Sequence, residues 1–171
     1  WVVLGLVGHD PWKTEDATSI GVEVEMAEHR DFVVPTLGGE PYLPHPPLAY
    51  MGGAVSLDLM SPPLTAHNAA RVVAGVALAL ILLATAYASR ELNGRAFRWL
   101  PVLILIGSIG LWDRAHVLSP EPGPAAGVAL ALYGWALALR RPVTGGVALG
   151  LGIALAFYTR GLLVPAWLLI T

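Results

Sequence analysis

The sequence predicts an all-α, polytopic membrane protein whose transmembrane helices follow an extracytoplasmic loop that carries interfacial helices. Only 13% of the 171 residues are charged, whereas about a quarter are charged in a typical soluble domain. Residues 72–89 and 123–139 contain no charge at all, and roughly 17 to 25 apolar residues suffice to cross a bilayer. Eight of the twelve acids, by contrast, lie between residues 9 and 47, which indicates a polar segment outside the membrane.

The chain is expected to form a single, partial transmembrane domain. Residues 1–8 would end a first span, residues 9–63 would form the extracytoplasmic catalytic loop, and residues 64–171 would supply further spans at about 64–89, 99–112, 123–139 and 143–158. Because apolar runs stand at both ends, we interpret the sequence as an N-terminal piece of a larger protein. A short, self-contained membrane protein is the alternative.

The polar loop has its own predicted elements. Asp10-Pro11 or Thr14 would start a first helix, and Tyr42 and His45 follow in a proline-rich stretch that excludes a regular helix. A second short surface helix is expected over residues 48–60. The first helix should carry Glu23, Glu25 and Glu28 on its wet face and lie in the membrane interface. Its expected apolar stripe consists of Ala17, Ile20, Gly21, Val24 and Ala27.

Arginine residues predict the orientation. Five of them fall in the connections at 90–98 and 140–141, and positive residues favour the cytoplasmic side. The acid-rich loop, the connection at 113–122 and Arg160 would then share the extracytoplasmic face. Glycines 145, 146, 150 and 152 lie within a predicted span and suit close helix packing.

Composition also excludes some classes of function. The chain has no cysteine, so disulfides, thiolate metal sites and cysteine nucleophiles are absent from it. The net charge is −2 and no basic patch stands out, so a nucleic-acid partner is not expected.

Several polar side chains are candidates for a site. Glu15 and Asp16 could act as a general base or as metal ligands, or simply cap the helix. Tyr42 and His45 could bind phosphate or transfer a proton, or belong to an ordinary interfacial loop. Arg71 could bind a phosphate by two donors, or it could extend to the membrane interface. Arg160 is a candidate for a buried cation that awaits an anionic ligand. The connection with Arg114, His116 and Glu121 is explained as readily by solvation as by function.

Several of these residues belong to short motifs that follow one another in a characteristic order along the sequence. The sequence has TEDATSIGVEVEM at 14–26, RDFVVP at 30–35 and GEPYLPHPPLAYMGGA at 39–54, followed by AAR at 69–71, LALY at 130–133 and YTRG at 158–161. This order resembles that of bacterial C-type glycosyltransferases related to the lipid A aminoarabinose transferase and to protein O-mannosyltransferases. The resemblance covers the whole chain and corresponds to roughly the N-terminal third of the family.

The resemblance implies roles for individual residues. The acidic pair of the family falls on Glu15 and Asp16, with the acid types reversed, and one of them would be the catalytic base. The tyrosine falls on Tyr42, and a lysine that contacts the carrier phosphate falls on His45, which is a departure. A second acid falls near Glu121, and a Lys/Arg-Gly pair falls on Arg160-Gly161. The carrier phosphate would need cations, for which Arg71 and Arg160 are candidates, and His45 is a third candidate, although histidine is only partly charged near neutrality.

The implied activity is transfer of a sugar from a polyprenyl-phosphate donor to a lipid or protein acceptor, at the outer face of a bacterial inner membrane. No cofactor is required, and a divalent metal is not established, although Glu15, Asp16 and His45 could provide ligands. The runner-up is a non-catalytic membrane protein, either a transporter segment or an assembly subunit. A third interpretation is a homologue that kept the fold and lost the activity.

Overall fold

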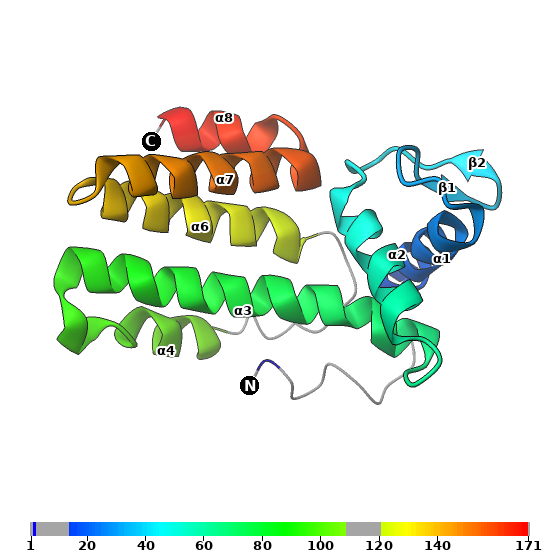
Figure 1. The fold of residues 1–171 in the computed structure, drawn as a ribbon, viewed down its shortest axis with the longest axis horizontal. Coiled ribbons are helices and arrows are strands. Elements are labelled where there is room, and N and C mark those ends of the chain that lie inside the picture. Colours follow the sequence, from blue (N-terminus) through cyan, green and yellow to red (C-terminus); the bar gives the residue numbers. More distant parts are fainter. Residues whose placement is uncertain (1, 3–13, 109–120, 171) are drawn as a thin grey trace.

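The computed structural model describes residues 2, 14–108 and 121–170, and these residues are mostly helical (Figure 1). The expected end of the first span, the Asp10-Pro11 helix start and the pair Arg114 and His116 lie outside the described residues. The helix expected after residue 10 is described from Thr14 as α1 (Thr14–His29).

Long apolar helices lie side by side and make up one part of the structure. These are α3 (Ala66–Asn93), α6 (Pro122–Ala138) and α7 (Pro142–Arg160), with α6 packed against both of the others. Proline occupies the first helical position of α6 and of α7, where its missing N–H costs nothing. The 3-10 helix η1 (Arg95–Phe97) and α4 (Leu100–Ile106) return along α3, and α8 (Leu163–Ile170) returns along α7 (Figure 1).

Two of the described helices, α3 and α7, are long and apolar enough to cross a membrane by length and composition. The segment expected as a span at 123–139 forms α6, a helix of 17 residues, and is not one of the two helices that meet this criterion. The span expected at 99–112 is described only up to residue 108, and there it forms the seven-residue helix α4. A mostly helical fold is therefore confirmed, whereas the polytopic topology stays a prediction.

Glycine lets α6 and α7 approach closely. A Cβ atom at Gly134 would lie 2.2 Å from the backbone nitrogen of Leu149, and one at Gly152 would lie 2.3 Å from that of Ala131, so neither site has room for a side chain. Of the four glycines expected to pack, 145 and 152 do so, whereas a Cβ at 146 or 150 would meet nothing within 4 Å. Residues seven positions apart share a helix face, and only the face of 145 and 152 meets α6.

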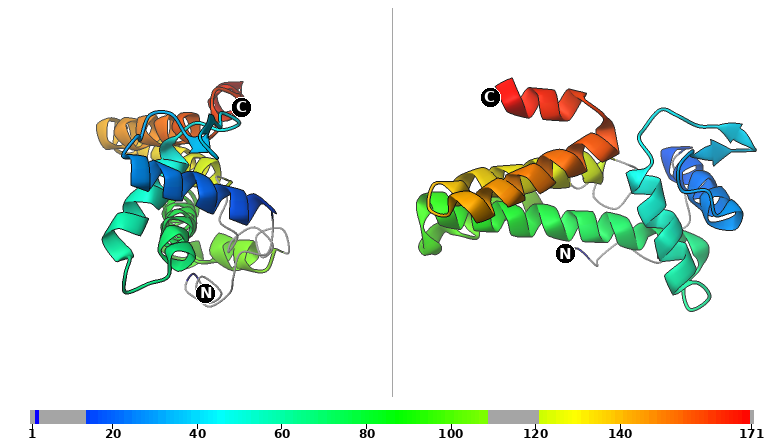
Figure 2. Two further views of the ribbon diagram at one scale, coloured as in Figure 1. Left: turned by 90° about the vertical axis from the view of Figure 1, so that its right-hand side faces the viewer. Right: turned by 45° about the horizontal axis from the view of Figure 1, so that its top comes forward.

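Helices α1 and α2 (Leu48–Met60) form the other part of the structure and cross the end of the apolar helices (Figure 2). The bounds of α2 match the prediction. Its Ser56 hydroxyl donates a hydrogen bond to the carbonyl oxygen of Ala69, 2.6 Å away, and thereby joins α2 to α3. The polar loop is thus packed on the apolar helices rather than extended away from them.

The face that α1 buries differs from the prediction. The apolar stripe is only partly buried, and its Ile20 and Val24 pack beside Leu57 of α2. The fully buried face includes two acids. Arg71 of α3 neutralises Asp16, and Gly53 of α2 leaves room for the carboxyl group of Glu23. The buried residues of α1 are Asp16, Ser19, Val22, Glu23 and Met26.

A short ribbon departs from the all-α prediction. Strands β1 (Thr36–Leu37) and β2 (Glu40–Pro41) pair antiparallel around Gly38 and Gly39, whose positive φ angles of 65° and 80° suit a two-residue hairpin turn. The Glu25 carboxylate accepts hydrogen bonds from both glycine N–H groups, and these bonds lower its pKa. Glu25 therefore tethers the turn to α1 from the solvent-accessible side of the helix. Glu28 is exposed, as predicted.

Charged residues separate to the two ends of the helices, as the arginine pattern predicted. At one end, Arg140 lies 3.9 Å from Glu91, so the connections at 90–98 and 140–141 are neighbours. At the opposite end, α1, α2, the start of α6 and the end of α7 come together (Figure 1). This second end holds the candidate site.

Candidate functional site

A pocket of about 210 Å³ lies where α1, the proline-rich segment and the start of α6 meet. Four of the predicted site residues line it, although they come from three separate parts of the sequence. The other lining residues are hydroxyl-bearing. The full set is Thr14, Glu15, Thr18, Ser19, Tyr42, His45, Tyr50 and Glu121.

The two ring side chains are held by the turns around them. The backbone N–H of Tyr42 donates to the carbonyl oxygen of Pro35 at 2.8 Å, and the Tyr42 ring stands edge-on to that of Tyr50, with centroids 6.4 Å apart. His45 is half-buried in the proline-rich segment, where proline restricts the backbone. A restricted segment keeps both side chains beside the pocket at little further entropic cost.

Arg160 reaches the same region through Glu121. Antiparallel packing places the last residue of α7 beside the N-cap of α6, and the Arg160 guanidinium forms a hydrogen-bonded ion pair with the Glu121 carboxylate. Both side chains are more than a third exposed, which corrects the expectation of a buried cation. An exposed guanidinium has five donors, so it can bind an anion while it keeps the contact with Glu121.

The electrostatic environment keeps His45 largely neutral. Burial lowers the pKa of His45 below its usual 6.5, the positive charge of Arg160 lowers it further, and Glu121 and Glu15 oppose the shift. A neutral imidazole accepts and donates one hydrogen bond each and can take up a proton. At neutral pH this residue is therefore suited to hydrogen bonding rather than to holding phosphate by charge.

The adjacent acids Glu15 and Asp16 have different environments. Glu15 is exposed and lines the pocket. The Asp16 carboxylate lies 2.7 Å from the Arg71 guanidinium, and neither side chain has any exposed surface. Neighbouring residues of a helix point about 100° apart, so only one of the two can face the pocket. The structure brings Glu15 to the pocket and places Asp16 and Arg71 in a buried ion pair between α1 and α3.

Tyr50, which the sequence analysis did not single out, lines this pocket and a second cavity behind it. Burial, with smaller contributions from Tyr42 and Glu23, raises the pKa of Tyr50 to about 12. Its hydroxyl therefore stays protonated and can donate a hydrogen bond. The sequence signal that could have identified Tyr50 is its position at the start of the helix that follows the proline-rich segment.

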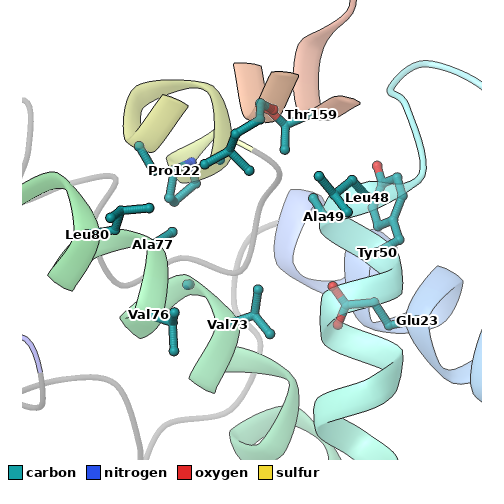
Figure 3. Close-up of a pocket in the computed structure, with 14 residues that line it drawn as sticks. Glu23, Leu48, Ala49, Tyr50, Val73, Val76, Ala77, Leu80, Pro122 and Thr159 are labelled. Carbon is teal, nitrogen blue, oxygen red and sulfur yellow. The ribbon is translucent and has the colours of Figure 1, made fainter. Parts of the chain in front are cut away.

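The second cavity has a volume of about 230 Å³ and lies between α2, α3, α6 and α7. It is lined mainly by apolar side chains such as Val73, Ala77 and Leu80, with Glu23 at its α1 side (Figure 3). The Glu23 side chain is only 3% exposed, which corrects the prediction that it lies on the wet face of α1.

The sequence left a divalent metal open, with Glu15, Asp16 and His45 as conceivable ligands. Among residues 14–108 and 121–170, no three histidine or acidic side chains are gathered as a metal site would require. Asp16 in particular is engaged with Arg71 rather than with the pocket.

Comparisons with protein-family models, with curated proteins and with solved structures find no match to this chain.

Proposed function

We propose that this chain belongs to an integral membrane glycosyltransferase, which moves a sugar from a polyprenyl-phosphate donor to a lipid or protein acceptor. The observation that carries the proposal is the convergence of Glu15, His45 and the Glu121–Arg160 pair on one pocket, from segments far apart in the sequence. The motif order described above supports it independently.

The position of the pocket suits an amphiphilic donor. It lies at the end of the apolar helices where the polar segment packs, opposite the arginine-rich end. A donor with a polyprenyl tail needs apolar surface beside a polar site, and positive residues favour the cytoplasm. The proposal therefore places the pocket at the extracytoplasmic face of a bacterial inner membrane.

Each group at the pocket has a chemical role in this proposal. The Glu15 carboxylate takes the proton of the acceptor hydroxyl as its oxygen attacks the anomeric carbon. The bond from that carbon to the phosphate oxygen breaks, and polyprenyl phosphate leaves with the electron pair, as in an inverting displacement. The Arg160 guanidinium holds the phosphate by charge-assisted hydrogen bonds, and His45 and Tyr42 orient donor or acceptor hydroxyls.

The role of general base is tested by Glu15→Gln in the full-length protein. Loss of a general base typically slows a reaction by about 10²–10⁴-fold, so we expect a loss of that size in transfer of labelled sugar from a panel of polyprenyl-phosphate donors. The matched control is Glu28→Gln, an exposed acid of the same helix, which should transfer at the wild-type rate.

Wild-type transfer by Glu15→Gln would remove Glu15 from the mechanism. A wild-type protein that binds donors without transferring sugar would instead favour a non-catalytic membrane protein or a homologue that has lost activity.

A further inference from the structure

Glu23 is a buried carboxyl group, and no cation pairs with it among residues 14–108 and 121–170. Its Oε2 atom has no hydrogen-bond partner among the described residues, and burial raises its pKa well above 4.5, with the nearby charge of Asp16 adding to the shift. A buried polar atom that lacks a partner costs about 1–3 kcal/mol, and more when it is charged. A ligand that donates a hydrogen bond to this oxygen would remove that cost.

The structure makes room for this carboxyl group. Gly53 is the residue of α2 that lies beside the Glu23 carboxyl group. A Cβ atom at Gly53 would lie 2.1 Å from the carboxyl carbon of Glu23. Any larger residue would displace the carboxyl group. Figure 3 shows the carboxylate oxygens on the side of α2 that faces Val73 across the apolar cavity.

The cavity offers few other polar groups. The Thr159 hydroxyl donates to the carbonyl oxygen of Leu155 in its own helix at 2.7 Å, and the Tyr50 hydroxyl stands at the side shared with the first pocket. A ligand here would thus meet a carboxyl group at one side and apolar side chains over most of its body.

The surrounding charges select the sign of that ligand. The negative charge of Asp16 on α1 is balanced by Arg71 of α3, Tyr50 of α2 stays neutral, and no Asp, Glu, Lys or Arg of α6 or α7 lines the cavity. Ionisation of Glu23 therefore leaves one uncompensated negative charge, which a single positive charge would balance. A neutral ligand would not balance it.

We propose that this cavity is a second ligand site, in which the Glu23 carboxylate binds the ammonium group of a primary amine whose apolar body fills the space between α2, α3 and α6. The site is independent of the glycosyltransferase proposal. It would serve for any amphiphilic amine that reaches the interface between the polar segment and the apolar helices.

The proton balance gives the site a pH signature. Below the raised pKa of Glu23 the free site is a neutral acid, so binding of an ammonium ion releases that proton to solvent. Affinity therefore rises with pH up to the pKa of Glu23 and stays level until the amine itself loses its proton.

The probe is benzylamine, titrated by calorimetry into the detergent-purified full-length protein, with benzyl alcohol as the neutral analogue of the same shape. We expect wild-type protein to bind benzylamine, with affinity rising as pH increases, and to bind benzyl alcohol roughly tenfold to a hundredfold more weakly. Glu23→Gln should lose the preference for the amine and its pH dependence, whereas Glu28→Gln should keep both. Gly53→Ala, which moves the carboxyl group, should weaken amine binding without affecting a mere surface interaction.

Three results would overturn the proposal: no benzylamine binding by the wild-type protein, equal binding of amine and alcohol, or unchanged binding by folded Glu23→Gln. The glycosyl-transfer assay of Glu15→Gln is unaffected by any of them, so the two proposals fail separately.

Discussion

Glu15 and Asp16 are adjacent in sequence, yet one faces a pocket and the other is sealed against Arg71. The sequence offers either acid as a base, and the geometry favours Glu15 because only its carboxylate reaches the pocket. Asp16 and Arg71 instead hold α1 on α3. An effect of Asp16 on catalysis stays a prediction. Asp16 would act by holding α1 in position, because its carboxylate does not line the pocket.

The buried pair predicts a large effect on stability. Asp16→Ala would leave the Arg71 charge without its carboxylate in the interior, which typically costs about 3–5 kcal/mol. The control is Asp58→Ala, which breaks the Arg30–Asp58 pair, because that pair has the same 2.7 Å separation but an Arg30 side chain that is 70% exposed. Breaking an exposed pair should cost at most about 1 kcal/mol.

Denaturant unfolding of the purified full-length variants measures both costs. The double variant Asp16→Leu/Arg71→Met should recover most of the stability that Asp16→Ala loses, because apolar residues can replace a buried ion pair. Equal costs for Asp16→Ala and Asp58→Ala would contradict a buried, stabilising role.

At the scale of elements, the contact between α6 and α7 depends on which glycines face it. A Cβ atom added at Gly145 or at Gly152 would lie 2.3 Å from a backbone nitrogen of α6, whereas one added at Gly146 or Gly150 would meet open space. This contact sets the positions of Glu121 and Arg160, at the start of α6 and the end of α7. Helix packing and the candidate site are thereby linked.

Matched substitutions on one helix test this link. Gly152→Ala should lower the midpoint of thermal unfolding because the two backbones must separate, at a typical cost of about 1–3 kcal/mol for overpacking. Gly150→Ala should be neutral or stabilising by up to about 1 kcal/mol, since alanine favours helices more than glycine does. Midpoints that fall equally in both variants would mean that the close contact does not determine stability.

At the scale of the whole molecule, the structure separates an arginine-rich end from an end that carries the polar segment. Arg140 and Glu91 mark the first end, and Glu121 and Arg160 mark the second. The distance between them follows from helix length, because α7, which runs from the first end to the second, has 19 residues and each residue adds about 1.5 Å. This separation is compatible with opposite faces of a bilayer.

The absence of cysteine from this sequence allows a direct test of orientation. Single variants Glu40→Cys and Arg140→Cys, in a full-length protein with any cysteines elsewhere replaced, would be treated on intact cells with a membrane-impermeant maleimide. We expect Glu40→Cys to be labelled directly and Arg140→Cys only after permeabilisation, because both side chains are exposed but the arginine-rich end favours the cytoplasm. Labelling of both positions from outside would contradict a membrane-spanning arrangement.

Local properties of the sequence were enough to predict much of the fold. Uninterrupted apolar stretches indicated α3, α6 and α7, prolines placed the non-helical segment around Tyr42 and His45, and arginines identified the two connections that share one end. The strands of the hairpin at Gly38-Gly39 could not be predicted, because two residues are too short a pattern to recognise. The sequence indicates Glu15, Tyr42, His45 and Glu121 as candidate site residues, whereas their meeting in one pocket depends on the packing of distant segments.

The environments of the acids were decided by tertiary structure alone. Periodicity assigns charged residues to the wet face of a helix, so it placed Glu23 in water, whereas a gap at Gly53 of another helix admits its carboxyl group to the interior. Asp16 is buried because Arg71, 55 residues away, neutralises it. The sequence by itself determined which segments are helical and apolar and where charge gathers. Only the packing of distant helices decided which carboxyl groups face a pocket, which are paired and which are buried without a partner, because burial and pairing depend on groups that the local sequence does not contain.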